Sequence, residues 1–340
     1  MLKLTEKLCN LFGPSSYEDL VREAIIEEIS PYCEKLYTDK VGNLIAFKKG
    51  KKSVEKPMVF SAHMDEVGVM IQYISDDGYL YFDTIGGVNN SVLGARRLII
   101  GDNKILGVIA SKAVHMQKRE ERGKCIPIEE MYIDIGCTTK EDAEKYVSVG
   151  DVATFVPNFE EFGDGFVKSK AIDDRFGCAV LCQMIKEDRE LDTVFVFTVC
   201  EETGCRGALS AAFALNADKA VIIESTTAGD MPGISEARRA CCVGKGAVLS
   251  VMDGGTVYDR DFFDKAVSIA KENDVKYQVK TTVCGGNEAR SYQTTGNGCK
   301  VLAISAPVRY IHSASCVAKT SDFEEVLSLA RLIADNVKEI

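Results

Sequence analysis

Short apolar runs alternate with longer amphipathic runs along most of the chain, above all after about residue 163. The short runs are rich in β-branched and aromatic residues, as buried strands are, and they predict strands at 58–62, 194–199, 220–224 and 301–306. The amphipathic runs repeat apolar residues at helical spacing and predict helices at 175–190, 261–274 and 322–339. Strands that alternate with helices predict an α/β domain whose sheet is covered on both faces.

A further helix is predicted near the N-terminus. Ser15 and Glu18 have the S-x-x-E spacing of a capping box, and they follow Gly13 and Pro14. The amphipathic run after them extends through Ile29, so we expect one helix that begins at this box and ends near that residue.

The pattern changes between Val67 and about Phe162. Here short alternating segments, such as 79–85, 97–101 and 105–111, are separated by Asp-Gly, Gly-Gly and Gly-Asp turns. This texture predicts a small β-rich domain at 67–162, inserted into an α/β domain that is formed by residues 1–66 and 163–340.

Composition narrows the class of protein. The 340 residues are 46% hydrophobic and 27% charged, as in ordinary globular proteins, and the net charge of −10 argues against nucleic-acid binding. No apolar run approaches the roughly 20 residues of a membrane span, and the first 20 residues lack the apolar core of a secretory signal. The 13 cysteines are an odd number without a CxxC pair, so we expect reduced thiols and a cytoplasmic location.

Histidines and carboxylates follow the predicted strands. His63 and Asp65 come after the first strand, and Glu201 and Glu202 after the second. Glu224 ends the third strand; the remaining candidates are His312, beyond the fourth strand, and Asp173, just before a predicted helix. Ligands bind outside the carboxyl ends of the strands in open α/β sheets, so we expect these side chains to converge on one crevice.

Such a set of ligands suits particular metal ions. Imidazole together with carboxylate favours zinc, cobalt or manganese over calcium. A carboxylate can also bridge two ions, and paired ions assist hydrolysis. Asp65 lies two positions from His63, on the same face of an extended chain, and could hold the second ring nitrogen of that imidazole.

Each residue also has an ordinary structural interpretation. An Asp-Asp pair before a helix is a common N-cap, and adjacent glutamates suit a helix start. Singly, these interpretations are the better ones. For the whole set of residues they are less convincing, because the chain has only three histidines and two of them stand beside these acids. The third histidine, His115, is assigned no role.

At these positions the sequence resembles the cytosolic co-catalytic metallo-aminopeptidases. That family includes glutamyl, deblocking and tetrahedral aminopeptidases, and some members carry endoglucanase-type names. Five matching stretches occur in order along nearly the whole chain, namely 61-SAHMDEVG-68, 170-KAIDDRFG-177, 201-EETGCRGA-208, 224-ESTTAGD-230 and 307-PVRYIHS-313.

The resemblance implies a role for each residue. His63, Asp173 and Glu224 would hold one ion, and Asp173 would bridge to a second ion that Glu202 and His312 complete. Glu201 would be the general base. Asp65 would support His63. The ions would be zinc or cobalt, with manganese possible, and the substrates short peptides.

The resemblance also implies an architecture. It consists of a phosphorylase/hydrolase-like αβα domain with an inserted β-barrel domain used in dimerisation, and the dimers assemble into tetrahedral dodecamers. The sequence departs from the family where a Gly-Gly-Thr-Asp-Ala segment is common, since it reads 285-GGNEARS-291, and where Glu224 replaces a common aspartate. Arg290 and Arg309 are the candidates for a cationic pocket that an acidic N-terminal residue would need.

Other functions remain open from the sequence. A carboxypeptidase or an N-acyl amino acid deacylase of the same architecture would use the same metal ligands. A glycosidase would need metal-independent carboxylates, and an assembly protein would hold only a structural metal. His312 and Cys316 could form a thiol-imidazole pair, although 13 dispersed cysteines make this the weaker hypothesis.

Overall fold

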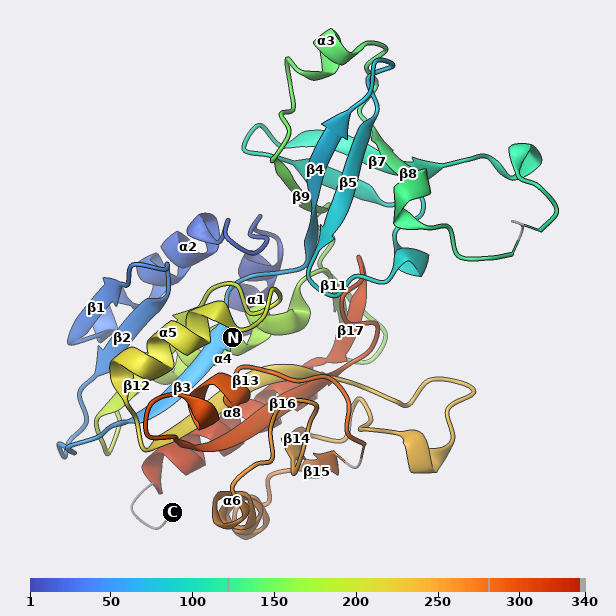
Figure 1. Cartoon of the computed structure of the whole chain (residues 1–340). Coiled ribbons are helices and arrows are strands. Elements are labelled where there is room, and N and C mark those ends of the chain that lie inside the picture. Colours follow the sequence, from blue (N-terminus) through green and yellow to red (C-terminus); the bar gives the residue numbers. More distant parts are fainter. Residues whose placement is uncertain (121–122, 281, 337–340) are drawn as a thin grey trace.

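A mixed eight-stranded sheet forms the centre of the protein. The computed structural model describes residues 1–120, 123–280 and 282–336. The strand order is β1-β2-β12-β3-β13-β16-β14-β15 (Figure 1). The four predicted strands are confirmed as its parallel centre: β12 (Thr193–Thr198), β3 (Met58–His63), β13 (Lys219–Thr227) and β16 (Lys300–Val308). The outer strands are β1 (Lys35–Thr38), β2 (Leu44–Lys48), β14 (Ala247–Ser250) and β15 (Tyr277–Lys280).

Helices cover both faces of this sheet. Successive strand residues point to opposite faces, so Val221 and Ile223 of β13 belong to one buried cluster and Ile222 to another. The first cluster includes residues of α1 (Leu2–Cys9), α2 (Asp19–Ile29), α4 (Ile172–Ile185), α6 (Arg260–Glu272) and α8 (Thr320–Asp335). The second includes residues of α5 (Arg206–Leu215) and α7 (Ala289–Thr294). The expected αβα layering is confirmed.

All three helices predicted after residue 163 end earlier in the structure, and the end of α6 at Glu272 differs least, from a predicted 274. Helix α4 ends at Ile185 rather than at 190, because the chain then turns back to the sheet edge, where the Arg189 carbonyl accepts a hydrogen bond from the Lys51 N–H at 3.0 Å. Helix α8 ends at Asp335, and positions 337–339 of the predicted helix lie outside the described residues. None of the helices described is both long and apolar enough to cross a bilayer.

The predicted capping box is wrong. Helix α2 begins at Asp19, and neither box residue caps it with its side chain. The Ser15 hydroxyl instead donates to Asp65 Oδ2 at 2.6 Å. The Glu18 carboxylate accepts from the backbone N–H of Ser16 at 2.9 Å and of Cys200 at 3.1 Å. Long-range partners at the sheet edge therefore replace the local cap.

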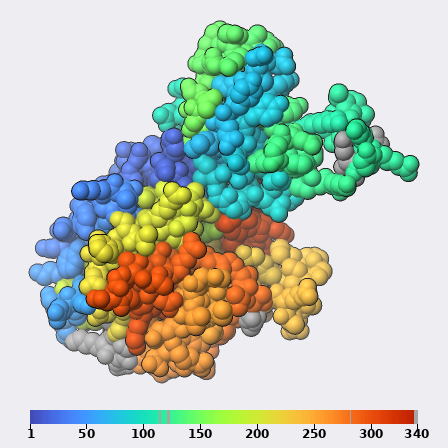
Figure 2. Space-filling model, in the orientation of Figure 1, coloured from blue at the N-terminus to red at the C-terminus, as the bar shows by residue number. Residues whose placement is uncertain are grey.

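A closed barrel stands off from the α/β body, as Figures 1 and 2 show. Its six strands are β4 (Gly68–Ile74), β5 (Leu80–Ile85), β8 (Met131–Asp134), β7 (Ile105–Ser111), β6 (Arg97–Ile100) and β9 (Val152–Phe155), in barrel order. The short helix α3 (Lys140–Ala143) precedes β9.

A separate three-stranded sheet lies beside the barrel, with β11 (Phe166–Ser169) between β10 (Glu160–Phe162) and β17 (Cys316–Lys319). Strand β10 thus falls within the segment 67–162 but pairs outside the barrel. The division of the chain into 1–66 with 163–340 and 67–162 stays a prediction.

A buried ionic cluster joins the base of the barrel to the α/β body. Glu66, just before the barrel, accepts from Lys170 Nζ at 2.6 and 2.7 Å, from Arg175 at 3.2 Å and from Thr154 of β9 at 2.8 Å. All four residues are almost fully buried. Removing one partner of such a pair typically costs about 3–5 kcal/mol, so the cluster holds the start of α4 in a defined place. Asp173 lies at this start.

Candidate metal centre

The side chains selected from the sequence meet at the carboxyl edge of the parallel strands. His63, the last residue of β3, lies in register with Thr198, the last residue of β12. Glu224 of β13 lies in register with Ser305 of β16. The loops and helix starts at the same edge supply the others, which are Asp65, Asp173, Glu201, Glu202 and His312. These residues therefore share one edge of the sheet, as expected.

Asp173 lies between the two imidazoles. Its Oδ1 is 3.5 Å from His63 Nε2, and its Oδ2 is 3.5 Å from His312 Nε2. His63 Nε2 is also 3.5 Å from Glu224 Oε1, and His312 Nε2 is 3.2 Å from Glu202 Oε2. A carboxylate that presents each oxygen to a different histidine is arranged to bridge two ions.

The residues fit divalent metal ions. Asp173 Oδ1 and Asp174 Oδ2 are buried and have no hydrogen-bond partner among the described residues, so each is free to ligate. The described residues include two sets of three ligand atoms, and within each set the atoms all lie within 4.8 Å of one another. They are His63, Asp173 and Glu202, and His63, Asp174 and Glu224. Nitrogen and carboxylate oxygen donors of this kind suit zinc, cobalt or manganese.

Asp174 performs the capping function that the sequence left open for the aspartate pair. Its Oδ1 accepts from the Gly177 N–H at 3.1 Å at the start of α4. Asp173 and Asp174 have non-helical backbone angles, and Asp173 is therefore available to the centre rather than to the helix. The nearness of Asp174 to His63 and Glu224 was missed from the sequence, because either member of a D-D pair can cap.

The two histidines have raised pKa values. Burial alone would lower the pKa of His312, but its contacts with Asp173 and Glu202 outweigh burial and raise this pKa to about 11. His63 is fully buried, and the charge of Glu224 together with contacts to Asp173 and Asp65 raises its pKa well above the usual value. Both rings are thus surrounded by negative charge, which a bound cation would also neutralise.

The pKa values of the buried acids are shifted as well. Burial raises the pKa of Glu202 to about 7 and that of Glu224 well above its usual range. Asp173 differs, because its contacts with His312 and His63 outweigh burial and lower its pKa. Several carboxylates that share one buried space are costly unless positive charge is present, and this supports the metal fit.

Asp65 connects His63 to the loop after β12. Its carboxylate accepts the backbone N–H of Glu201 at 2.9 Å and that of Glu202 at 3.1 Å, besides the Ser15 hydroxyl. His63 Nδ1 lies 3.1 Å from the Asp65 carbonyl oxygen and 3.4 Å from its Oδ1. One buried aspartate thus orients the imidazole and fixes the backbone of both glutamates.

Glu201 is held by a thiol that the sequence reading did not select. Cys205, at the start of α5, donates from Sγ to Glu201 Oε1 at 3.0 Å. Burial raises the pKa of Glu201, and it also raises the pKa of the Cys205 thiol, which is therefore a neutral donor. Glu201 is next to the centre but belongs to neither of the sets of metal-ligand atoms.

The divergent segment 285–291 supplies another buried acid. Glu288 accepts from the hydroxyls of Ser61, at 2.7 Å, and Thr198, and burial raises its pKa to about 7. Ser61 and Thr198 lie on β3 and β12, beneath the centre. A carboxylate in a glycine-rich segment gives no sequence signal for this position, because its partners are far away in the chain.

A cavity of about 90 Å³ opens beside the centre. Asp173, Glu224 and His312 line one part of it, and Asp253 and Lys280 line another. Lys280 ends β15, is 8% exposed, donates to the Cys284 carbonyl at 2.7 Å and makes no ion pair with a described residue. The cavity has room for several water molecules, since one needs about 10–15 Å³.

Asp253 is already occupied by its own loop. Its carboxylate accepts from the Tyr258 hydroxyl at 2.6 Å and from the backbone N–H groups of Gly255 and Thr256, both at 2.8 Å. Of the two charged residues Asp253 and Lys280, Lys280 therefore has more unused hydrogen-bonding capacity. The sequence reading missed both residues.

Neither arginine proposed for a cationic pocket lines this cavity. Arg309 forms a two-pronged ion pair with Asp230, at 2.8 and 2.6 Å, and Arg290 is exposed on α7.

The Cys316 thiol does not contact His312. It donates to the carbonyl oxygens of Tyr310 and Ser313, and burial raises its pKa to about 12. A thiol nucleophile needs the opposite, namely a lowered pKa and a neighbouring base. The thiol-imidazole hypothesis is therefore not supported.

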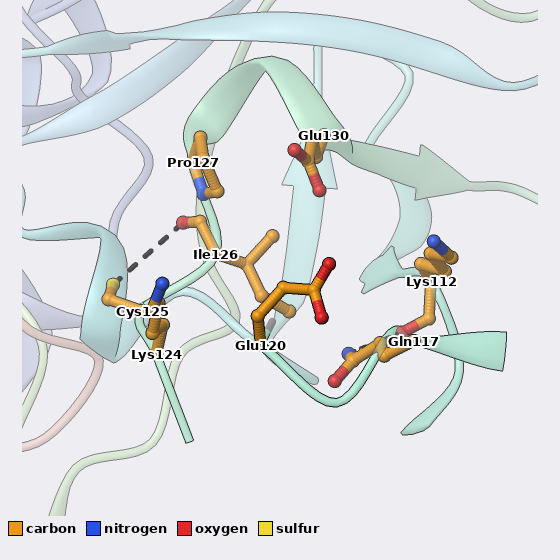
Figure 3. A pocket seen from close by; sticks show the side chains of 8 residues that line it. All are labelled: Lys112, Gln117, Glu120, Lys124, Cys125, Ile126, Pro127 and Glu130. Carbon is orange, nitrogen blue, oxygen red and sulfur yellow. Dashed lines mark hydrogen bonds between the residues drawn. The ribbon is translucent and has the colours of Figure 1, made fainter. Parts of the chain in front are cut away.

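Another cavity, of about 230 Å³, lies in the segment between β7 and β8, called here the arm (Figure 3). The residues that line it include Lys112, Glu120, Cys125 and Glu130. None of the histidines and acids at the strand ends of the central sheet lines this cavity. His115 lies on this arm and is exposed. None of the described residues of this arm belongs to the sets of metal-ligand atoms.

Known proteins resemble this chain over nearly its whole length. The sequence model described as M42 glutamyl aminopeptidase matches residues 42–329. A putative aminopeptidase of Acetivibrio thermocellus is 39% identical over 332 residues, which cover 97% of each chain. The crystal structure of a TET aminopeptidase from Thaumarchaeota archaeon SCGC AB-539-E09 is 31% identical, with a TM-score of 0.95 and coverage of 99% of this chain and 96% of that one. The TET1 peptidase of Pyrococcus horikoshii, which assembles into a tetrahedron or a large octahedral shell, is 32% identical, with a TM-score of 0.89 and coverage of 98% and 99%.

Proposed function

The chain belongs to the family of M42 glutamyl aminopeptidases, and on that premise we propose how its strand-end residues remove the N-terminal residue of a peptide. The protein is a metal-dependent aminopeptidase. The observation that supports the proposed site best is Asp173, whose two carboxylate oxygens each lie 3.5 Å from a different histidine.

We propose two ion positions. His63, Asp173 and Glu224 would hold one divalent ion; Asp173, Glu202 and His312 would hold the second. Zinc or cobalt suits these donors, and manganese is possible. When bound, such ions polarise the scissile carbonyl and lower the pKa of a water molecule.

Glu201 is the proposed general base. Its carboxylate accepts the proton of the attacking water and returns that proton to the leaving nitrogen. Asp65 fixes the Glu201 backbone N–H, and Cys205 holds one carboxylate oxygen. The other oxygen is thereby left to face the reaction. The acidic surroundings favour a substrate with a free, cationic α-amine.

The test of this function is a comparison of substrate classes. Aminoacyl anilides and short peptides should be cleaved, whereas N-acyl amino acids and oligosaccharides should not. Activity should disappear after chelation and return when zinc, cobalt or manganese is added. Faster hydrolysis of N-acyl amino acids would indicate a deacylase, and glycosidase activity that survives chelation would overturn the proposal.

We propose further that the cavity beside the centre, called here the side-chain cavity, receives the side chain of the N-terminal residue of the substrate. Lys280 would make this cavity selective for an acidic residue. The ammonium group lines a small cavity that also contains three proposed metal ligands. A carboxylate of the substrate would pair with it at little cost in reorganisation, because Lys280 is already buried and held by the Cys284 carbonyl.

A Lys280→Met variant should distinguish N-terminal residues. We expect kcat/KM for glutamyl anilide to fall about 10- to 100-fold, which is the range for losing a hydrogen bond to a charged group. The value of kcat/KM for leucyl anilide should change little. Lys276→Met, at an exposed lysine near the start of the same strand, is the control. A wild-type preference for lysyl anilide would instead assign the recognition to Asp253.

Assembly and location are also proposals. We propose that the chain forms homo-oligomers in which the barrel segment 67–162 pairs in dimers, and that the dimers build a tetrahedral dodecamer. Self-assembly of the similar TET1 peptidase supports this. All 13 cysteines are unpaired, which supports a reducing, cytoplasmic location.

A further inference from the structure

A groove of about 550 Å³ lies between the barrel and the small three-stranded sheet. Val92 and Arg96 line it from the barrel side, Phe162 from β10, and Tyr310 and Ser313 from the loop after β16. It shares no lining residue with the side-chain cavity beside Lys280. The two hollows are therefore distinct.

One loop borders both the groove and the metal centre. Tyr310 and Ser313 stand on either side of His312 in the chain, and His312 Nε2 contacts Asp173 and Glu202. On its other edge, His312 Nδ1 lies 3.1 Å from the carbonyl oxygen of Gly87, in the barrel segment that leads to Val92. Ser313 also lines a small cavity whose wall includes Asp173, Glu202 and His312, so the groove adjoins the side of the centre that Glu202 and His312 form.

The groove has the chemistry of a peptide-binding surface. Phe162 and Tyr310 are 47% and 51% exposed, so two aromatic faces are available to substrate side chains. Lys168 is already paired with Glu160 at 2.9 Å. Arg96 is exposed, donates from Nε to the Val92 carbonyl at 2.9 Å, and has no acidic partner among the described residues. Its guanidinium can therefore pair with an anion in the groove.

We propose that this groove binds the part of the peptide substrate that lies beyond the scissile bond, and that Arg96 pairs with the C-terminal carboxylate of a short peptide. The inference rests on the proposed function, because an aminopeptidase must place the N-terminal side chain on one side of its centre and the leaving peptide on another. The two distinct hollows meet this requirement.

The test compares substrates that reach the groove with one that does not. An aminoacyl 4-nitroanilide has no residue beyond the scissile bond, whereas peptides of two to five residues extend past it. Each peptide is prepared with a free and with an amidated C-terminus. For at least one length, wild-type kcat/KM should be about two- to fivefold higher with the free carboxylate, the range for an exposed ion pair.

Arg96→Ala should abolish this preference for the free carboxylate without changing hydrolysis of the nitroanilide. Arg97→Ala, at the neighbouring exposed arginine outside the groove, should leave the preference intact. Phe162→Ala should raise KM for the longer peptides and leave the nitroanilide unaffected.

Three results overturn the inference: a wild-type enzyme indifferent to amidation, an Arg96→Ala variant that keeps the preference, or equal losses on peptide and nitroanilide. If instead the metal-loaded wild type cleaves neither substrate, the proposed function itself fails.

Discussion

Replacing Glu201 with glutamine is expected to leave both metal ions bound and to lower kcat by on the order of 10²–10⁴-fold, which is the usual contribution of a positioned proton acceptor. Glutamine preserves the shape of the side chain and can still contact the Cys205 thiol, but it cannot take a proton from water. Because Asp65 fixes the Glu201 backbone N–H, the loop should keep its place. Metal content by elemental analysis and turnover of an aminoacyl anilide measure the two effects separately.

The neighbouring Glu202→Gln variant is the matched control. It is expected to lose activity together with metal, because Glu202 contacts His312 and lies in a group of potential metal ligands. A Glu201→Gln variant that turns over like the wild type when loaded with metal would remove Glu201 from the mechanism.

Replacing Asp173 with asparagine is expected to weaken both ions at once. Asp173 is the carboxylate that faces both histidines, and asparagine presents only one oxygen and no charge. Loss of an outer-sphere partner typically costs 10–100-fold in metal affinity, so loss of a bridging ligand should cost more than about 100-fold. Elemental analysis after gel filtration would report the ions retained per subunit.

Asp174→Asn is the comparison variant for this prediction, because Asp174 is in one of the sets of metal-ligand atoms but in neither of the proposed ion positions. Asparagine retains the N-cap function toward Gly177, so α4 should still begin in the same place. Saturating metal should stabilise the wild type and Asp174→Asn against heat but not Asp173→Asn, because a ligand at 100 times its Kd adds about 2.7 kcal/mol. Retained metal in Asp173→Asn with loss in Asp174→Asn would assign the bridging role to Asp174.

The sequence was sufficient for the main features of the fold and for the convergence of the site. Apolar β-branched runs that alternate with helical runs identify the four central strands, and residues at the ends of parallel strands share one sheet edge. His63, Glu224 and the pair Glu201 and Glu202 are found in this way, because each directly follows or ends such a run.

Features that depend on distant partners could not be predicted. Ser15 and Glu18 read as a capping box, but their partners are Asp65 and the Cys200 N–H, which only folding brings near. Lys280 ends an ordinary short strand, and its proposed role follows only from its place in the wall of the folded cavity. Local spacing contains no information about such contacts.

The adjacent glutamates after β12 illustrate how folding separates two similar residues. Asp65 accepts the N–H of each, which holds the turn in one conformation. Their side chains then meet different partners, since Glu201 contacts the Cys205 thiol and Glu202 contacts His312. The same short turn can therefore supply both a base and a metal ligand.

The central claim is that bound divalent ions and a free substrate amine are both required for removal of the N-terminal residue. The most direct measurement is mass spectrometry of one pentapeptide, with its amine free or acetylated, incubated with chelated and with metal-restored protein. We predict stepwise loss of N-terminal residues from the free peptide alone, and only after metal is restored. Residues released from the C-terminus, equal cleavage of the acetylated peptide, or full activity in the presence of chelator would contradict the claim.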